Sequence, residues 1–144
     1  MIRTDPHPTN SPVILILDDQ ESIRHLVSRI AITSVPGAIV LQAGTNREAL
    51  GIAVGRRIDV VIQDYQREGE TGLDFARELR SLPGPHPPVI IYSGTGFQKI
   101  ADACWRCDLE AEELFEEIIP KVETNVLAVR LKSLFSACSP PDES

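Results

Sequence analysis

The sequence lacks long apolar runs and has few cysteines and few basic residues, and each of these features excludes a class of protein. Its 144 residues contain no apolar run of membrane-spanning length, and the polar, proline-bearing stretch 1–12 is not a secretory signal. Three cysteines, an odd number, do not suggest a disulfide framework, so we expect a reducing, cytoplasmic setting. The chain also has few basic residues: it contains 14 Lys and Arg but 21 Asp and Glu. The resulting net charge of −7 argues against a nucleic-acid-binding surface.

A chain of this length has room for one domain with a substantial core. Polar, proline-containing ends cannot contribute to that core because they hold too little apolar surface. We therefore predict a disordered lead over 1–12, a folded domain over 13–136 and a flexible tail over 137–144.

Short apolar segments alternate five times with helical patterns along the domain. An unbroken apolar run of this length is typical of a strand buried on both faces of a parallel sheet. The predicted strands are 13–17, 38–43, 59–65, 88–92 and 117–121. The alternation predicts an α/β fold: a flavodoxin-like, doubly wound, five-stranded parallel sheet of order 2-1-3-4-5 with helices on both faces. The fifth strand is then an edge, where a proline such as Pro120 is tolerated.

Helix starts and apolar stripes support this alternation. Thr45 and Glu48 have the spacing of a capping box, Thr71 resembles another helix start, and Thr124 can cap the last helix. In the first helix, apolar residues at i, i+3, i+4 and i+7 predict one buried face. They are Ile23, Leu26, Val27 and Ile30.

Polar side chains follow the predicted strands where each strand leaves the core. Asp18 and Asp19 follow the first, Asp64 the third, Ser93 the fourth and Lys121 the fifth. The carboxyl ends of parallel strands meet at one edge of the sheet, so we expect these groups to converge. Adjacent carboxylates repel unless a cation lies among them, and an all-oxygen site suits Mg²⁺. A lysine and a hydroxyl beside the same acid are suited to a phosphoryl group.

Each of these residues also has a simpler interpretation when taken alone. Asp64 could cap a loop, and the Asp18–Asp19 pair could stabilise a helix dipole. Ser93 could cap the next helix, and Lys121 could be a solvated edge residue. Their joint occurrence at strand ends favours a functional site.

In combination, these residues resemble the response-regulator receiver domain of two-component signalling. The resemblance covers roughly 13–135, nearly the whole chain. The pattern consists of the acid pair, the acid after the third strand, Gly72 eight residues later, and the hydroxyl and lysine after the last two strands.

The resemblance implies a role for each site residue. Asp64 would be the phosphoacceptor, attacking a phosphohistidine of a histidine kinase or histidine phosphotransfer protein, and the acyl phosphate would then be hydrolysed. Mg²⁺ would be held directly by Asp19, through water by Asp18, and by Asp64 and the backbone carbonyl of Gln66. The hydroxyl of Ser93 and the ammonium of Lys121 would each bind a phosphoryl oxygen.

Such a protein is a signalling switch and not a classical enzyme, since it catalyses only its own phosphorylation and dephosphorylation. We expect a stand-alone receiver that acts on a downstream protein or on a second copy through the 97–135 face, without nucleic acid or membrane. One alternative is a pseudo-receiver, an interaction module that is not phosphorylated. Another is an aspartate-dependent phosphatase, which would need a second Asp where Gln66 stands.

Several positions depart from the receiver pattern. Glu68 stands where the family often has proline, and Val122 follows Lys121 where a cis proline is usual. Ile118 replaces the Tyr or Phe that serves as a rotamer switch. The segment between Ser93 and the lysine is also a few residues longer than usual.

Cys104 and Cys107 have C-x-x-C spacing, which places both thiols on one face of a helix. A redox pair and a pair of buried helix cysteines are both compatible with this spacing. Zinc would need two more ligands, and no nearby Cys or His supplies them. The acids over 108–117 are expected to form a solvated face.

Overall fold

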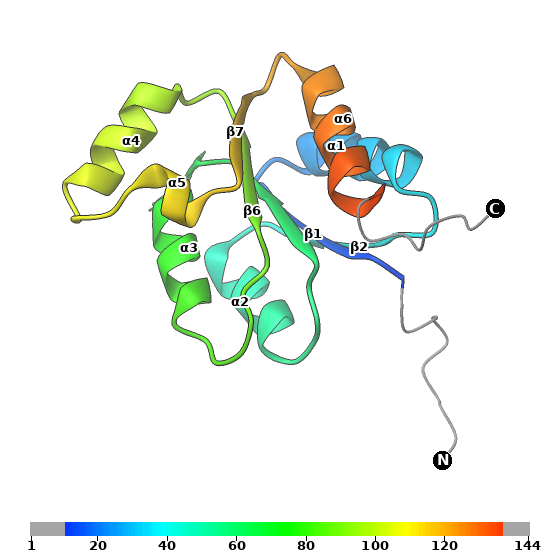
Figure 1. Ribbon diagram of the computed structural model, residues 1–144, viewed down its shortest axis with the longest axis horizontal. Coiled ribbons are helices and arrows are strands. Elements are labelled where there is room, and N and C mark those ends of the chain that lie inside the picture. Colours follow the sequence, from blue (N-terminus) through cyan, green and yellow to red (C-terminus); the bar gives the residue numbers. More distant parts are fainter. Residues whose placement is uncertain (1–10, 137–144) are drawn as a thin grey trace.

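The computed structural model describes residues 11–136, in which a parallel sheet separates two layers of helices (Figure 1). The lead over 1–12 and the tail over 137–144 stay predictions, because 1–10 and 137–144 lie outside the described residues. The strands are β1 (Val13–Leu17), β2 (Ile39–Ala43), β3 (Val60–Gln63), β6 (Val89–Ser93) and β7 (Glu117–Pro120). Their order, β2-β1-β3-β6-β7, confirms the predicted 2-1-3-4-5 topology.

The central strands are buried because helices cover them on both sides. Every residue of β1, β3 and β6 is buried, which explains their unbroken apolar runs. The sheet edges are more open: most of β2 is only half-buried, and Pro120 at the end of β7 is exposed. Pro120 thus occupies the edge position at which a missing N–H is tolerated.

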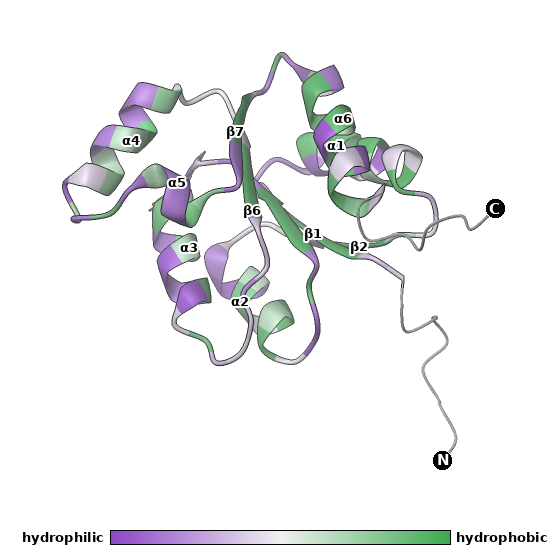
Figure 2. Ribbon diagram, viewed as in Figure 1, coloured by the Kyte–Doolittle hydropathy of each residue, from purple (hydrophilic) through white to green (hydrophobic). Residues whose placement is uncertain are grey.

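Helices α1 (Glu21–Ser34) and α6 (Thr124–Ser136) cover one face of the sheet. The other face carries α2 (Asn46–Val54), α3 (Gly72–Arg80), α4 (Phe97–Trp105) and the short α5 (Ala111–Leu114), as Figure 1 shows. Each face has its own hydrophobic core. Figure 2 shows the central strands as the most continuously hydrophobic part of the molecule.

Two predicted helix starts are confirmed and one is shifted. The Thr45 hydroxyl accepts the Glu48 N–H at 3.1 Å, and the Thr71 hydroxyl accepts the Asp74 N–H at 3.2 Å. Thr124 is instead the first residue of α6 and does not precede it. The main-chain carbonyl one residue earlier already accepts hydrogen bonds from the first turn, so the helix starts there.

The predicted buried face of α1 is wrong at Leu26, whose side chain is 43% exposed. The stripe that contacts the core runs through Val27 and Ala31, with Ile23 and Ile30 partly buried beside it. Leu26 precedes Val27 by one residue and therefore lies beside this stripe, on the solvent-facing side of α1.

The loop after β3 contains structure that the sequence pattern did not predict. Its residues form a two-stranded antiparallel hairpin of β4 (Gln66–Arg67) and β5 (Glu70–Thr71). Gly69 at its turn has a φ of +77°, in the left-handed region that favours glycine. The hairpin leads directly into α3, so the residues after Asp64 are held in an ordered arrangement.

Candidate functional site

The register of the sheet brings the three predicted acids together. Leu17 pairs with Gln63, so Asp18 and Asp64 leave the sheet side by side, and the Asp64 N–H donates to the Leu17 carbonyl at 3.0 Å. Carboxylate oxygens of Asp18, Asp19 and Asp64 all lie within 4.8 Å of one another. We call these three residues the acid pocket. Its position at the carboxyl end of the central strands agrees with the expected location of a ligand site.

Lys121 is the cation that faces the acid pocket. Its Nζ lies 3.1 Å from Asp64 Oδ2 and 3.3 Å from Asp18 Oδ2. Burial lowers the pKa of Lys121, but the hydrogen bond to Asp64 and the two carboxylate charges outweigh it, and the pKa is raised. The lysine therefore stays protonated, and its ammonium contacts the predicted acceptor.

Asp18 is the most deeply buried acid of the pocket, at 3% exposure. Burial raises the pKa of its carboxyl, while the Gln20 N–H, which donates to Oδ1 at 2.9 Å, and Lys121 lower it. The balance leaves the pKa above its usual range, chiefly because the carboxyl is buried, with the Asp64 charge as a smaller contribution.

Ser93 contacts the Asp64 carboxylate oxygen that Lys121 does not. It is buried, and its hydroxyl donates to Asp64 Oδ1 at 2.5 Å. Ser93 Oγ also accepts the Thr95 N–H at 3.1 Å, whereas the residue that caps α4 is Gly96. Ser93 therefore orders the turn after β6 but does not cap the helix, and its hydroxyl is committed to Asp64.

Asp19 reaches the pocket from the solvent side, and its carboxylate is anchored by the hairpin. The main-chain N–H of Glu68 donates to Asp19 Oδ2 at 3.0 Å. A proline at this position, as in the receiver pattern, has no N–H to donate. Gln66 begins β4 two residues after Asp64 with an exposed side chain, and metal binding by its carbonyl stays a prediction.

The chain around Lys121 is held by two hydrogen bonds that the sequence analysis missed. The buried Tyr92 donates its hydroxyl to the Lys121 carbonyl at 2.8 Å, and the Lys121 N–H donates to the Ser93 carbonyl at 3.1 Å. Among residues 11–136 no peptide bond is cis, so Val122 follows the lysine through a trans bond.

The donor chemistry of the acid pocket fits Mg²⁺. Asp18, Asp19 and Asp64 offer only oxygen, which hard divalent cations prefer, and three carboxylates exceed the charge of one lysine. Within the described part of the chain, this is the one group of three or more Asp, Glu, His or Cys side chains that lie close enough to share a metal ion.

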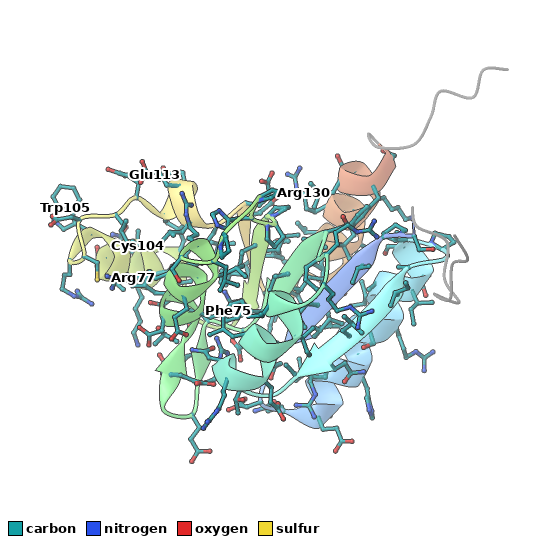
Figure 3. All side chains as sticks on the ribbon, turned by 90° about the horizontal axis from the view of Figure 1, so that it is seen from below. Phe75, Arg77, Cys104, Trp105, Glu113 and Arg130 are labelled. Atoms are coloured by element: carbon teal, nitrogen blue, oxygen red, sulfur yellow. The ribbon has the colours of Figure 1, made fainter. Side chains whose placement is uncertain are left out.

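Of the C-x-x-C pair, Cys104 lies in the last turn of α4 and Cys107 in the turn that follows, so the two thiols do not share one helix as predicted. Cys104 is buried with a pKa raised by burial, whereas Cys107 is half-buried and lies 3.6 Å from Arg77 Nη1. Figure 3 shows Trp105 pointing outward at the end of α4. Cys104 thus packs as a core residue, and no metal group in residues 11–136 includes either thiol. A redox role of the pair stays a prediction.

The acids over 108–117 are exposed as expected, except at the last position. Glu117 is half-buried and forms an ion pair with Arg130 of α6. This contact joins β7 to the last helix, so Glu117 belongs to the packing of the sheet edge.

Sequence reasoning also missed a polar cluster behind the acid pocket. Arg67 donates from Nε to the main-chain carbonyl of Asp64 at 3.0 Å, and it is enclosed with Gln63 and Asn46. The available signal was Gln63, a polar residue inside the predicted buried strand 59–65; Arg67 lies beyond that strand, and the sequence pattern gave no sign of its burial.

Residues 14–114 match the family model described as the response regulator receiver domain. A curated relative, the cyclic di-GMP phosphodiesterase response regulator RpfG of Xanthomonas campestris pv. campestris, is 34% identical over 91 residues. The matched region covers 62% of this chain and 24% of RpfG, so the chain spans only a minor part of that relative.

Solved structures of receiver domains are similar over most of this chain. A response regulator receiver domain protein from Clostridium thermocellum is 27% identical, with a TM-score of 0.69 over 88% of this chain and 96% of that one. Two others, below 25% identity, show the fold alone. They are the signal receiver domain of an HD domain-containing protein from Pseudomonas fluorescens Pf-5 (20% identity, TM-score 0.71, 94% of each chain) and the response regulator TrrA from Thermotoga maritima in complex with Mg²⁺ and BeF (23% identity, TM-score 0.69, 85% and 98%).

Proposed function

The chain belongs to the response regulator receiver domain family, and on this premise we propose that it accepts a phosphoryl group on Asp64 from a histidine kinase or histidine phosphotransfer protein. Receiver domains are signalling modules, so the expected outcome of this transfer is a change in protein binding. The folded unit for this function is 13–136. None of the helices within 11–136 combines the length and apolarity needed to cross a bilayer, and we place the protein in the cytoplasm.

The observation that carries this proposal is the environment of the Asp64 carboxylate. Ser93 donates to one of its oxygens and Lys121 to the other. In the transfer, a carboxylate oxygen forms a bond to phosphorus while the bond from phosphorus to the donor histidine breaks, and the electron pair leaves with the imidazole. The Ser93 hydroxyl and the Lys121 ammonium then turn to phosphoryl oxygens, where they stabilise the negative charge.

The residues that would hold Mg²⁺ are Asp19 and Asp64 directly, Asp18 through water, and the carbonyl of Gln66. When bound, the ion supplies positive charge that offsets the charge of the carboxylates and the phosphoryl oxygens. Asp18 is already tied to Lys121 and to the Gln20 N–H, whereas Asp19 is exposed and held at one oxygen only. This difference supports the direct role for Asp19.

We further propose that the phosphorylated protein acts through the 97–135 face on a downstream protein or a second copy. This face comprises α4, β7 and α6 and includes exposed apolar side chains at Phe97, Trp105 and Val129. Ser93 links the acid pocket to α4 because it is the last residue of β6 and bonds Asp64 directly. Ile118 is half-buried and has no ring to reorient, so movement of Ser93 and the turn after it would carry the change.

The test is intact-mass measurement after incubation with Mg²⁺ and a small acyl phosphate donor. The wild-type protein should gain one phosphoryl group, chelation of the metal should prevent the gain, and Asp64→Asn should remain unmodified while folded. Asp108→Asn is a matched control, since Asp108 is exposed with a φ of 60° that Asn also tolerates, and it should label like the wild type. Labelling of Asp64→Asn at the wild-type level would contradict the proposal.

A pseudo-receiver is the second candidate, and one observation favours it. The acid pocket satisfies its own hydrogen bonds through Lys121, Ser93 and the Glu68 N–H, and in residues 11–136 no buried side-chain nitrogen or oxygen lacks a partner. In the mass experiment this candidate predicts no labelling at any donor concentration, although the protein is folded and binds Mg²⁺.

A further inference from the structure

Arg67 is an enclosed arginine in the hairpin that follows Asp64. Its side chain has no exposed surface, although arginine is seldom fully buried in proteins. An arginine keeps its charge even when burial lowers its pKa, as it does here. Enclosing such a charge is costly unless partners surround it, and replacement by apolar residues is often neutral for stability. Stability therefore does not explain why an arginine occupies this position.

All three nitrogens of the Arg67 guanidinium donate hydrogen bonds. Nε donates to the Asp64 carbonyl at 3.0 Å, and Nη2 donates to Gln63 Oε1 at 2.8 Å. Nη1 donates to Asn46 Oδ1 at 2.5 Å and to Glu70 Oε2 at 3.0 Å. These partners come from the end of β3, the start of α2 and the hairpin, so one side chain joins three segments around the acceptor.

The partners of Arg67 are themselves linked, which fixes the guanidinium in place. The Asn46 N–H donates to Glu70 Oε2 at 2.8 Å, and Gln63 Nε2 donates to the Gly72 carbonyl at 3.2 Å. The Gly72 N–H in turn donates to the Tyr65 carbonyl at 2.6 Å. The main chain on both sides of Asp64 is therefore held from behind the acid pocket.

The charge of Arg67 also acts on the acid pocket. Among residues 11–136, Glu70 is the one carboxylate that pairs with Arg67, and the Glu70 side chain is partly exposed, so this pair is partly screened by water. Its favourable electrostatic interactions extend to Asp64, Asp19 and Asp18. The pocket thus has Lys121 on one side and a second, buried cation on the other.

We propose that Arg67 is a permanent internal counter-charge of the acid pocket and the positioning residue for Asp64. As a fixed positive charge it offsets part of the carboxylate charge, so the pocket binds Mg²⁺ more weakly than its acids alone would. As a rigid fork it holds the acceptor's main chain. The proposal deepens the proposed function, because it concerns the same acids and the same metal.

The test is calorimetric titration of Mg²⁺ into three variants and the wild type at low ionic strength. Gln63→Leu/Arg67→Leu replaces the polar pair with apolar side chains and should bind Mg²⁺ about threefold or more tightly, because a nearby positive charge is lost. Arg67→Lys keeps the charge and should stay within about twofold of the wild-type affinity. Arg106→Leu removes an exposed arginine at the C-terminal end of α4 and is the control for the loss of one positive charge from the protein. The Mg²⁺ affinity of this variant should equal that of the wild type.

The phosphorylation rate supplies the second measurement. Arg67→Lys cannot reproduce the planar fork, so it should be phosphorylated several-fold more slowly than the wild type at saturating Mg²⁺, despite its normal metal affinity. A residue with a merely structural role would lower metal affinity and rate together, whereas we expect the apolar double variant to bind metal more tightly.

If the folded double variant binds Mg²⁺ as tightly as the wild type or more weakly, Arg67 is not a counter-charge of the acid pocket. If Arg67→Lys is phosphorylated at the wild-type rate, Arg67 is not a positioning residue for Asp64. Circular dichroism establishes that each variant is folded. The titration does not require phosphorylation, so it decides on the counter-charge even if the wild-type protein never accepts a phosphoryl group. In that event the proposed function fails while the metal result stands by itself.

Discussion

The Asp19 carboxylate shows how one atypical residue can change the support of a site. Glu68 stands where receivers often have proline, and its main-chain N–H donates to Asp19 Oδ2. The exposed Glu68 side chain takes no part in this bond. What matters at this position is therefore the N–H that any residue except proline supplies.

Glu68→Pro should consequently weaken Mg²⁺ binding about tenfold, the usual loss when a group that orients a metal ligand is removed. Glu68→Ala retains the N–H and is the matched control, with an affinity close to that of the wild type. Calorimetric titration of both variants measures the difference. Similar affinities for Glu68→Pro and Glu68→Ala would mean that the bond to Asp19 does not support the site.

At the scale of secondary-structure elements, the start of α3 is limited by its contact with β3. Gly72 is the first residue of α3, and a Cβ there would lie 3.1 Å from Gln63 Cδ and 3.2 Å from Ile91 Cδ1. Gln63 cannot move away freely, since it is bonded to Arg67 and to the Gly72 carbonyl. The glycine thus permits the close approach of helix and sheet.

Gly72→Ala should therefore destabilise the protein by about 1–3 kcal/mol, the cost of overpacking a tight site, despite alanine's higher helix propensity. Gly51→Ala in α2 is the matched control because nothing lies within 4 Å of the added Cβ, and it should gain up to about 1 kcal/mol. Urea unfolding followed by circular dichroism gives both values. A stabilised Gly72→Ala variant would show that β3 yields to the added methyl group.

At the scale of the whole molecule, the helices on the two faces of the sheet are arranged differently. On one face, α1 and α6 pack against each other over a single core. On the other, α4 contributes Ile100 and Cys104 to the core and ends at Trp105, which is 72% exposed and points outward (Figure 3). Trp105 does not fill a local core, and the 97–119 segment has exposed apolar surface available to a partner.

We expect phosphorylation to change the 97–119 segment. Backbone amide spectra recorded with and without Mg²⁺ and beryllofluoride should show shifts from the acid pocket through the turn after Ser93 to α4 and β7, because packed elements have discrete alternative arrangements. Asp64→Asn under the same conditions is the control and should show no such shifts. Changes confined to the acid pocket would contradict this account of the switch.

The alternation of apolar runs and helical patterns was enough to predict the sheet, its order and the convergence of the acids. Strand ends in a parallel sheet meet at one edge whatever the details of packing, so Asp18, Asp64 and Lys121 could be placed together from their spacing alone. Capping signals at Thr45 and Thr71 were equally local and are confirmed.

The tertiary structure alone decided the contacts made between segments distant in the sequence. Spacing does not reveal that the Glu68 N–H reaches Asp19, that the Tyr92 hydroxyl holds the Lys121 carbonyl, or that Arg67 is buried. A charged residue in a glycine-bearing loop reads as solvent-exposed, because local pattern contains no information on which distant acceptors will surround it. The acceptors of Arg67 come from the end of β3, the start of α2 and the hairpin, and only the tertiary fold brings these three segments together.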